Sequence, residues 1–304
     1  MSWEKLGLIF TPSGENESLI SHGSMPLAYK LDGDLYRFYF SSRDSKNSSS
    51  INYLEVDINK PSKILKLSNK PLLSKGPYGH FDDNGLYSGC LMKKNGKLYM
   101  FYSGRSNGVE NLFYMNIGLA VSEDNGLSFK RVKNYPILSR SQYDPWLVTA
   151  PSVFLSNNKF FMVYTSGTAI FNDRTSNYDL KLASSDDFFN WKSTGKTVIP
   201  LEEGESNIST SSIIHYNNKF HMCFSVKPND GEYRIGYASS EDGTYWKRDD
   251  NLLGLMVGGA GFDEKAVSYP NLFLHGNYVY MLYSGSYNGL GGFGIARSSL
   301  KNFK

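Results

Sequence analysis

The sequence predicts an all-β fold, a five-bladed β-propeller with four strands in each blade. Five aromatic residues recur at intervals of about 60 residues along the chain: Tyr39, Tyr102, Tyr164, Phe224 and Tyr283. Each lies in a short, largely apolar segment with strand-like alternation: LYRFYFSSR, LYMFYSGR, FFMVYTSG, FHMCFSVK and VYMLYSGS. A repeat of this length, built from short strands, is typical of a propeller in which each repeat forms one blade.

The second repeat shows how each blade is expected to be built. Residues 86–93 predict a first strand, and an Asn-Gly turn leads into a second strand at residues 97–103. Residues 116–122 predict the third strand, and the fourth follows from Phe129. A Ser-x-Asp pattern precedes the fourth strand here and in the next two repeats, and its side chains are expected to close the turn by bonding to the turn's own backbone.

The fifth repeat ends after its third strand, which has the sequence FGIARSSL. Residues 2–10 resemble the fourth-strand segments that begin at Phe129, Trp191 and Trp246. We therefore expect the N-terminal strand to complete the last blade, so that residues 1–304 form a single domain. A ring closed in this way leaves no open sheet edge with which another chain could pair.

The composition excludes several classes of partner. The formal net charge is +3, from 32 basic and 29 acidic residues, and no dense basic run indicates a nucleic-acid partner. No apolar run reaches the ~18 residues of a membrane-spanning helix, and the N-terminal residues lack a signal-peptide pattern. No metal-ligand spacing or phosphate loop is present, so no metal ion or cofactor is expected. Nothing in the composition predicts an oligomeric state.

The two cysteines, Cys90 and Cys223, fall in the strand patterns of different blades. They are expected to be buried free thiols, because no pairing partner lies in the same repeat. Such thiols are typical of a reducing compartment, and we expect a cytoplasmic protein.

Candidate catalytic residues lie in the loops that precede the first strand of a blade. In propellers generally, these loops open on the same face as the loops between second and third strands. Four repeats carry an acid there: Asp82, Asp144, Glu205 and Asp263. Cleavage of a glycosidic bond requires two carboxylates, one that protonates the leaving oxygen and one that activates water or attacks. We predict these four as catalytic, with Asp144 orienting and Glu205 as general acid. Asp82 or Asp263 is then the base.

The repeat leaves a second interpretation open. Asp82, Asp144 and Asp263 occupy the same place in their repeats, whereas catalysis needs asymmetry. An aspartate at a fixed loop position often braces the loop by accepting hydrogen bonds from the backbone. Loop bracing and catalysis are therefore both hypotheses for these acids.

Basic and aromatic residues in the same loops are candidates for substrate binding. They are His22, Arg43, Arg105, Trp146, Lys227 and Arg234. Arginine forks match the oxygens of phosphate or carboxylate two at a time, so an anionic group is expected to bind at this face. The tryptophan offers an apolar face to a sugar ring. The alternative is that the arginines neutralise the ring of acids.

The blade pattern resembles that of the five-bladed propeller glycosidases of glycoside hydrolase families 32, 43, 62, 68 and 130. The resemblance covers the whole chain and is carried by segments such as FDDNGLYSG, YDPWLVTAPSVF, FDEKAVSYPNLF and MLYSGSYNGLGGFGIA. It is closer to a bacterial group of glycosidase-like propellers, many of which are linked to surface-polysaccharide gene clusters. The resemblance implies a sugar or glycan ligand and, as the leading hypothesis, a glycoside hydrolase.

One departure from that resemblance keeps two alternatives open. Family 43 enzymes typically carry an acid immediately before the first-strand proline of a blade, or two residues before it. Here those places hold Met25, Ser88, Ala150 and Tyr269, or Ser24, Tyr87, Thr149 and Ser268. None is acidic. The chain could instead be a glycoside phosphorylase, which uses one acid and a basic cluster that holds phosphate, or a carbohydrate-binding propeller without catalysis.

Overall fold

The computed structural model describes residues 1–304 except 109–111, 172–174, 254 and 304, and it is all-β. Short helical turns occur at α1 (Ser286–Gly289), η1 (Asp250–Leu252) and η2 (Leu300–Asn302). None of the helices formed by the described residues has the length and apolar character needed to cross a membrane.

The strands form three sheets, two of which have eight strands. The first contains β2 (Ser21–Asp32), β3 (Leu35–Arg43), β4 (Ser49–Asp57), β5 (Ile64–Leu67), β6 (Gly85–Lys94), β7 (Lys97–Asn107), β8 (Phe113–Ser122) and β9 (Lys130–Arg131). The second contains β10 (Leu147–Ser156), β11 (Lys159–Ile170), β12 (Ser176–Ser185), β13 (Lys192–Ile199), β14 (Glu205–Tyr216), β15 (Lys219–Pro228), β16 (Arg234–Ser240) and β17 (Lys247–Arg248). The third has the order β1 (Glu4–Phe10), β20 (Phe293–Ser299), β19 (Tyr278–Ser284) and β18 (Ser268–His275).

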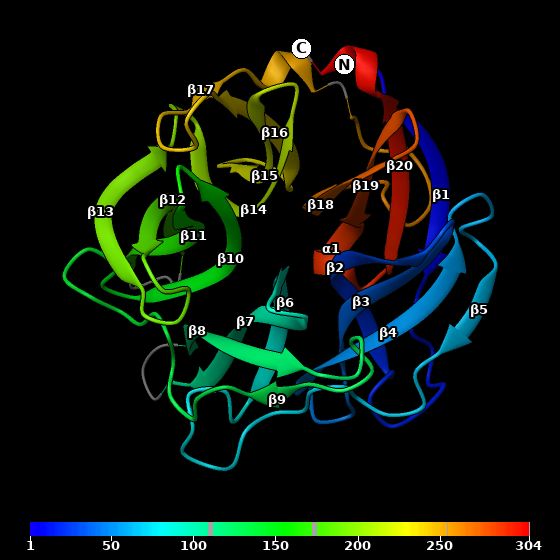
Figure 1. Cartoon of the computed structure of the whole chain (residues 1–304), viewed down its shortest axis with the longest axis horizontal. Coiled ribbons are helices and arrows are strands. Elements are labelled where there is room, and N and C mark those ends of the chain that lie inside the picture. The colour runs from blue at the N-terminus through cyan, green and yellow to red at the C-terminus, as the bar shows by residue number, and fades with distance from the viewer. Residues whose placement is uncertain (109–111, 172–174, 254, 304) are drawn as a thin grey trace.

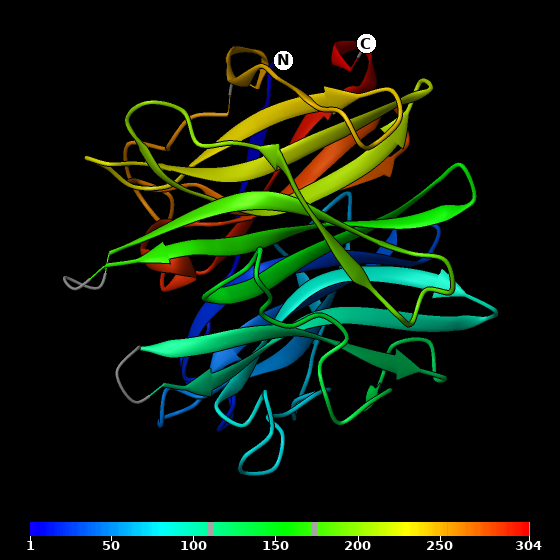
Figure 2. The ribbon, with the colours of Figure 1, turned by 90° about the vertical axis from the view of Figure 1, so that its left-hand side faces the viewer.

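Each eight-stranded sheet consists of two groups of four sequential strands. Within a group, neighbouring strands pair antiparallel, and the two groups meet through a single parallel pair, Ser49 with Gly85 or Tyr178 with Asn207. Figure 1 shows the groups arranged around a common centre, and Figure 2 shows the same strands from the side. The N-terminal strand β1 pairs antiparallel with β20, so the two ends of the chain share one sheet.

The strands of the second group lie where the sequence analysis expects them, with longer hairpins. The predicted second strand, 97–103, extends to Asn107, and the predicted third strand, 116–122, begins at Phe113. The Asn-Gly turn between β6 and β7 has positive φ at both residues, 51° and 74°, as a two-residue hairpin turn requires. The Ser-x-Asp turns also act structurally, since the Asp124 carboxylate accepts hydrogen bonds from the backbone of Leu127 and Ser128.

Apolar side chains between neighbouring groups of strands form the core. One cluster packs Phe38 and Leu54 of the first group against Leu282 and Ile295 of the last. Other clusters join the first group to the second, the second to the third, the third to the fourth and the fourth to the fifth. Each group therefore buries its apolar faces against both neighbours in space.

Five hydrogen bonds between neighbouring groups fix the innermost strands. In each, a backbone N–H of a first strand donates to a second-strand hydroxyl of the preceding group, with N···O distances of 2.8 to 3.2 Å: Met25 to Ser284, Ser88 to Ser41, Ala150 to Ser103, Thr210 to Thr165 and Tyr269 to Ser225. Four of the donors have positive φ, between 42° and 54°. The strand register shifts at all five, as in β-bulges, which redirect side chains.

Candidate functional site

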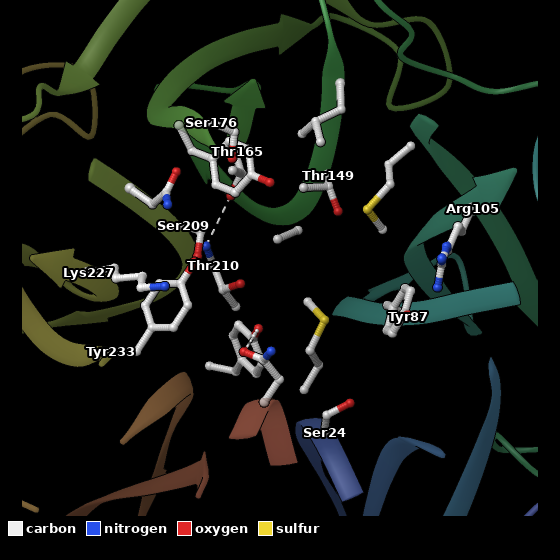
Figure 3. Close-up of a pocket in the computed structure, with 18 of the residues that line it drawn as sticks. Ser24, Tyr87, Arg105, Thr149, Thr165, Ser176, Ser209, Thr210, Lys227 and Tyr233 are labelled. Atoms are coloured by element: carbon white, nitrogen blue, oxygen red, sulfur yellow. Dashed lines mark hydrogen bonds between the residues drawn. The ribbon is translucent and has the colours of Figure 1, made fainter. Parts of the chain in front are cut away.

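A cavity of about 590 Å³ lies at the centre of the molecule, where the inner strands of the groups meet (Figure 3). Its volume falls within the roughly 300–1,000 Å³ of typical ligand pockets. Five tyrosines line it: Tyr87, Tyr178, Tyr233, Tyr269 and Tyr287. Serine and threonine side chains separate these rings, so the wall offers apolar faces and hydroxyl groups, the combination that sugar rings need.

Residues at the bulges of the first strands line this cavity. Met25, Ala150, Thr210 and Tyr269, the four bulge residues with positive φ, all line it. Three of them stand immediately before a first-strand proline, where the resemblance to family 43 would place an acid. The cavity therefore includes the places at which standard arabinosidase-type acids are expected, and those places are occupied by neutral side chains.

Three of the predicted binding residues line the cavity: Arg43, Arg105 and Lys227. The Arg43 Nη1 donates to Asn47 at 2.8 Å, the Arg105 guanidinium lies 5.1 Å from the Phe113 ring, and the Lys227 ammonium lies 6.0 Å from the Tyr233 ring. In the part of the chain that the structure describes, none of these three cations forms an ion pair with a carboxylate. Their charge is therefore available to an anionic ligand.

Several buried polar atoms of the cavity wall have no hydrogen-bond partner within the described protein. They are Nε of Arg43, Nε of Arg105, Oδ1 of Asn207 and Oγ of Ser209. An unpaired buried polar atom costs roughly 1–3 kcal/mol, so such atoms in native proteins call for an explanation. A polar ligand in the cavity would satisfy donors and acceptors together.

One acidic residue lines the cavity among the described residues, and the sequence analysis did not select it. Glu232 lies in the loop between β15 and β16 and is exposed. The Arg234 side chain fixes that loop, because its Nη1 donates to the carbonyl oxygens of Glu232, Tyr233 and Lys265. The loop joins the second and third strands of its group, the same kind of loop that supplies the predicted basic residues, so the position of Glu232 in the repeat is a signal for it.

The predicted catalytic residue Asp82 lies outside the cavity lining and is fully buried. Its Oδ2 accepts a hydrogen bond from the Tyr102 hydroxyl at 3.0 Å and another from Arg131 Nε at 2.7 Å. Tyr102 is a repeat anchor of β7, and Arg131 belongs to β9. The carboxylate thus ties its loop to the second and fourth strands of its own group.

Asp144 and Asp263 repeat this arrangement. Asp144 accepts from the Tyr164 hydroxyl at 3.0 Å and from Ser141 at 2.7 Å, and Lys181 Nζ lies 3.8 Å away. Asp263 accepts from the Tyr283 hydroxyl at 3.0 Å and from Lys5 Nζ at 2.5 Å. Both carboxylates are buried and neither lines the cavity.

Glu205, the predicted general acid, forms a close pair with Arg248, whose Nη1 lies 2.9 Å from Oε2. Burial alone would raise the pKa of Glu205, but the hydrogen bonds from Arg248 and the Glu202 backbone hold it below its usual value. A general acid needs the opposite shift. None of the four predicted acids lines the cavity, and their contacts favour the loop-bracing hypothesis.

The other predicted binding residues also lie outside the cavity lining. Trp146 is buried, with its indole N–H directed at the Phe113 carbonyl and its ring packed near Phe113 and Tyr178. His22 has φ of 61°, and burial together with the nearby Arg43 charge lowers its pKa to about 4. Within the described residues, no group of three or more His, Cys, Asp or Glu side chains could hold a metal ion.

Comparison with known proteins gives a matching family and several relatives. Residues 74–204 match the family described as "Glycosyl hydrolases family 32 N-terminal domain". The uncharacterized protein Rv1502 of Mycobacterium tuberculosis (strain ATCC 25618 / H37Rv) is 31% identical over 299 residues, which cover 97% of this chain and 99% of that protein. A β-1,2-mannobiose phosphorylase of Thermoanaerobacter sp. (strain X514) is 27% identical over 140 residues, 43% of this chain and 45% of the enzyme.

Solved structures show the same fold at low sequence identity. The β-1,2-mannobiose phosphorylase from Listeria innocua, in complex with β-1,2-mannobiose, superposes with a TM-score of 0.76 at 12% identity, over 99% of this chain and 98% of the enzyme. A thermostable family-43 glycoside hydrolase gives a TM-score of 0.67 at 18% identity, over 92% and 90% of the two chains. The chain therefore belongs to the family of the Mycobacterium tuberculosis protein Rv1502, and its fold is that of the propeller glycoside hydrolases and phosphorylases.

Proposed function

We propose that the protein is an enzyme that cleaves a glycosidic bond in the central cavity by phosphorolysis. The observation that carries the proposal is the charge of the cavity, which Arg43, Arg105 and Lys227 line with no ion-pair partner among the described residues. Hydrolysis by two carboxylates needs both to flank one bond, about 5–10 Å apart. The lining of the cavity, as far as the structure describes it, includes one carboxylate, that of Glu232.

In phosphorolysis, a phosphate oxygen bonds to the anomeric carbon as the glycosidic C–O bond breaks, and the leaving oxygen takes up a proton. Guanidinium groups suit the phosphate because their N–H donors match its oxygens in pairs. Glu232 is the described lining residue that could supply the proton, which phosphate then restores to it. The similarity to a β-1,2-mannobiose phosphorylase over part of the chain supports this chemistry.

We also infer that residues 1–304 form one five-bladed propeller closed by β1. Three observations support this architecture. The apolar clusters join successive groups and also the last group to the first. The hydrogen bonds from first-strand N–H groups to second-strand hydroxyls also join successive groups, as from Ser88 to Ser41, and the first group to the last, from Met25 to Ser284. The pairing of β1 with β20 supplies the fourth strand of the last group.

The assay is release of sugar phosphate from a panel of glycosides, beginning with β-1,2-mannobiose because two similar proteins are named for it. We expect turnover to require phosphate, and Arg105→Gln to raise the KM for phosphate at least about ten-fold, equivalent to one guanidinium–phosphate interaction. Arg140→Gln, which removes an exposed arginine outside the cavity lining, is the matched control. Phosphate-independent turnover that persists in Arg105→Gln would favour hydrolysis and contradict the proposal.

A second candidate, glycan binding without catalysis, is favoured by one observation. All four predicted catalytic acids lie next to a basic side chain, Arg131, Lys181, Arg248 or Lys5. A phosphate-independent glycan affinity with no cleavage of any panel member would establish this alternative.

We further propose that the protein works in the cytoplasm. Support comes from Cys90 and Cys223, which are free thiols in different apolar clusters. Burial raises the pKa of the Cys90 thiol to about 12, so it is expected to be inert. Labelling of both cysteines by a thiol reagent only after unfolding would be consistent with this proposal.

A further inference from the structure

The three cations of the cavity fall into two separated groups. Figure 3 shows Arg105 beside Tyr87 on one side of the cavity and Lys227 beside Tyr233 on the opposite side. From these positions we infer that the glycoside itself carries an anionic group, a carboxylate or a phosphate ester, which Lys227 recognises while the arginines hold inorganic phosphate. The inference deepens the proposed function and rests on it for the role of the arginines.

Strand register places the two arginines in one row. Arg43 of β3 pairs with Ser49 of β4, Ser49 with Gly85 of β6, and Gly85 with Arg105 of β7. Tyr87 is two residues along β6 from Gly85, so it lies on the same face of that strand. Both arginines line the cavity and both leave a buried Nε without a partner. The two guanidinium groups therefore belong to the same side of the cavity, three strand spacings apart, each with an N–H group free for an anion.

The lysine side belongs to a different sheet. Lys227 of β15 pairs with Asn207 of β14, whose buried Oδ1 has no hydrogen-bond donor in the described protein. The Oγ of Ser209 in the same strand is also unpartnered. Lys227, Asn207 and Ser209 all line the cavity, so this side offers an ammonium group, an amide oxygen and a hydroxyl. Such a set matches a single anionic substituent with neighbouring sugar hydroxyls, whereas a lone phosphate ion would be held better by guanidinium forks.

Glu232 lines the same cavity as Lys227 without forming an ion pair with it among the described contacts. Glu232 also contributes to raising the pKa of Lys265, after the hydrogen bond to Tyr287 and the charge of Glu264. Among the described lining residues, three cations stand against one carboxylate, and two anionic groups, one at each site, would offset the excess positive charge.

The tyrosines between the two sites suit a sugar ring. Tyr269 stands at the bulge before Pro270, its hydroxyl donates to Asn288, and its ring lies 6.1 Å from that of Tyr233. Burial raises the pKa of Tyr269, so its phenol stays neutral and presents a ring face and a hydroxyl. A pyranose in contact with these rings would lie between the arginine side and Lys227.

The test is calorimetric titration of the full chain with two kinds of probe. Inorganic phosphate is titrated first, and then, at saturating phosphate, matched acidic and neutral sugars: glucuronate and glucose, galacturonate and galactose, mannose 6-phosphate and mannose. We expect at least one acidic sugar to bind ten-fold or more tightly than its neutral partner. Lys227→Gln should remove that preference and leave phosphate affinity within about two-fold, whereas Arg105→Gln should weaken phosphate ten-fold or more.

Lys219→Gln is the control for lysine removal, because Lys219 lies at the other end of β15 and outside the cavity lining. Equal affinity for acidic and neutral sugars, no sugar binding at all, or a preference that survives in Lys227→Gln would overturn the inference. A Lys227-dependent preference without any phosphate binding would uphold the recognition of an acidic sugar and overturn phosphorolysis. Loss of phosphate binding in both variants would show one shared anion site and overturn the inference.

Discussion

Three of the repeat anchors, Tyr102, Tyr164 and Tyr283, donate a hydrogen bond to an aspartate of their own group, each at 3.0 Å. In the fourth repeat the anchor is Phe224, and Glu205, one position closer to its anchor than the aspartates are, pairs with Arg248, which lies 5.3 Å from the Phe224 ring. In these four groups, a carboxylate near the start of the first strand is therefore bonded to the second or the fourth strand of its own group. The arrangement explains why residues that a sequence would nominate for catalysis lie outside the cavity.

At the residue scale, the Glu205→Gln variant distinguishes a structural role of this carboxylate from a role as general acid. Removing one partner of a fully buried ion pair costs about 3–5 kcal/mol. Glu205 is partly buried and Arg248 keeps Asp250 as a partner, so the melting temperature at pH 7 should fall by less than that cost implies. The pKa of Glu205 is lowered in the folded protein, so its contribution is present above about 4.5 and is lost as the pH falls through the folded pKa. The stability difference between variant and wild type should therefore shrink below pH 4.5. A turnover loss of about 10²–10⁴ with unchanged stability would instead support the catalytic hypothesis.

His22 provides a second pH test, in which the titrating group is a base instead of an acid. Its pKa falls from 6.5 to about 4 because of burial and the Arg43 charge, so the unfolded chain binds more protons between these values. Stability is complete above pH 6.5 and decreases as the pH falls towards 4. His22→Asn keeps a residue that tolerates the observed φ of 61° and should show a shallower decrease in melting temperature across that interval. An identical pH profile in the two proteins would show that this titration is not coupled to folding.

At the scale of elements, the period of the repeat predicts the strand order well, because four strands of alternating residues recur with the same turns. The N-terminal strand and the hairpin turns follow from the same comparison of repeats. The bulges do not, since Met25, Ala150, Thr210 and Tyr269 share no residue type, and each donates its backbone N–H to a hydroxyl group of the preceding group of strands, a contact between distant parts of the chain. The bulges decide which side chains line the cavity, so the site was the part that sequence reasoning located least well.

Removal of residues 1–10 tests the element that joins the two ends of the chain. The truncation deletes the partner of β20, the Lys5 contact with Asp263, and the buried side chains of Ile9 and Phe10. Burial of each such apolar side chain contributes roughly 1.5–3 kcal/mol, so we expect a large decrease in melting temperature or a chain that aggregates through the exposed edge of β20. Retention of the full melting temperature would mean that β1 does not close the structure.

At the scale of the whole molecule, the groups of strands meet at one central cavity, and four of the five bulge residues lie in its lining. Charged side chains are distributed unevenly over the molecule. Acids and bases neutralise each other within the groups, while three cations are left at the cavity. This distribution, more than any single residue, distinguishes the site from one built on a pair of carboxylates.

The central claim is that the cavity binds an anion through its arginines, and a crystal structure of the protein grown with phosphate tests it most directly. The account predicts a phosphate in the cavity with oxygens about 2.7–2.9 Å from nitrogen atoms of Arg43 and Arg105, the distance of a charge-assisted hydrogen bond. The Arg43→Gln, Arg105→Gln double variant, crystallised in the same way, should have no phosphate there. A wild-type cavity without phosphate at a concentration that saturates turnover, or phosphate bound equally in the double variant, would contradict the account.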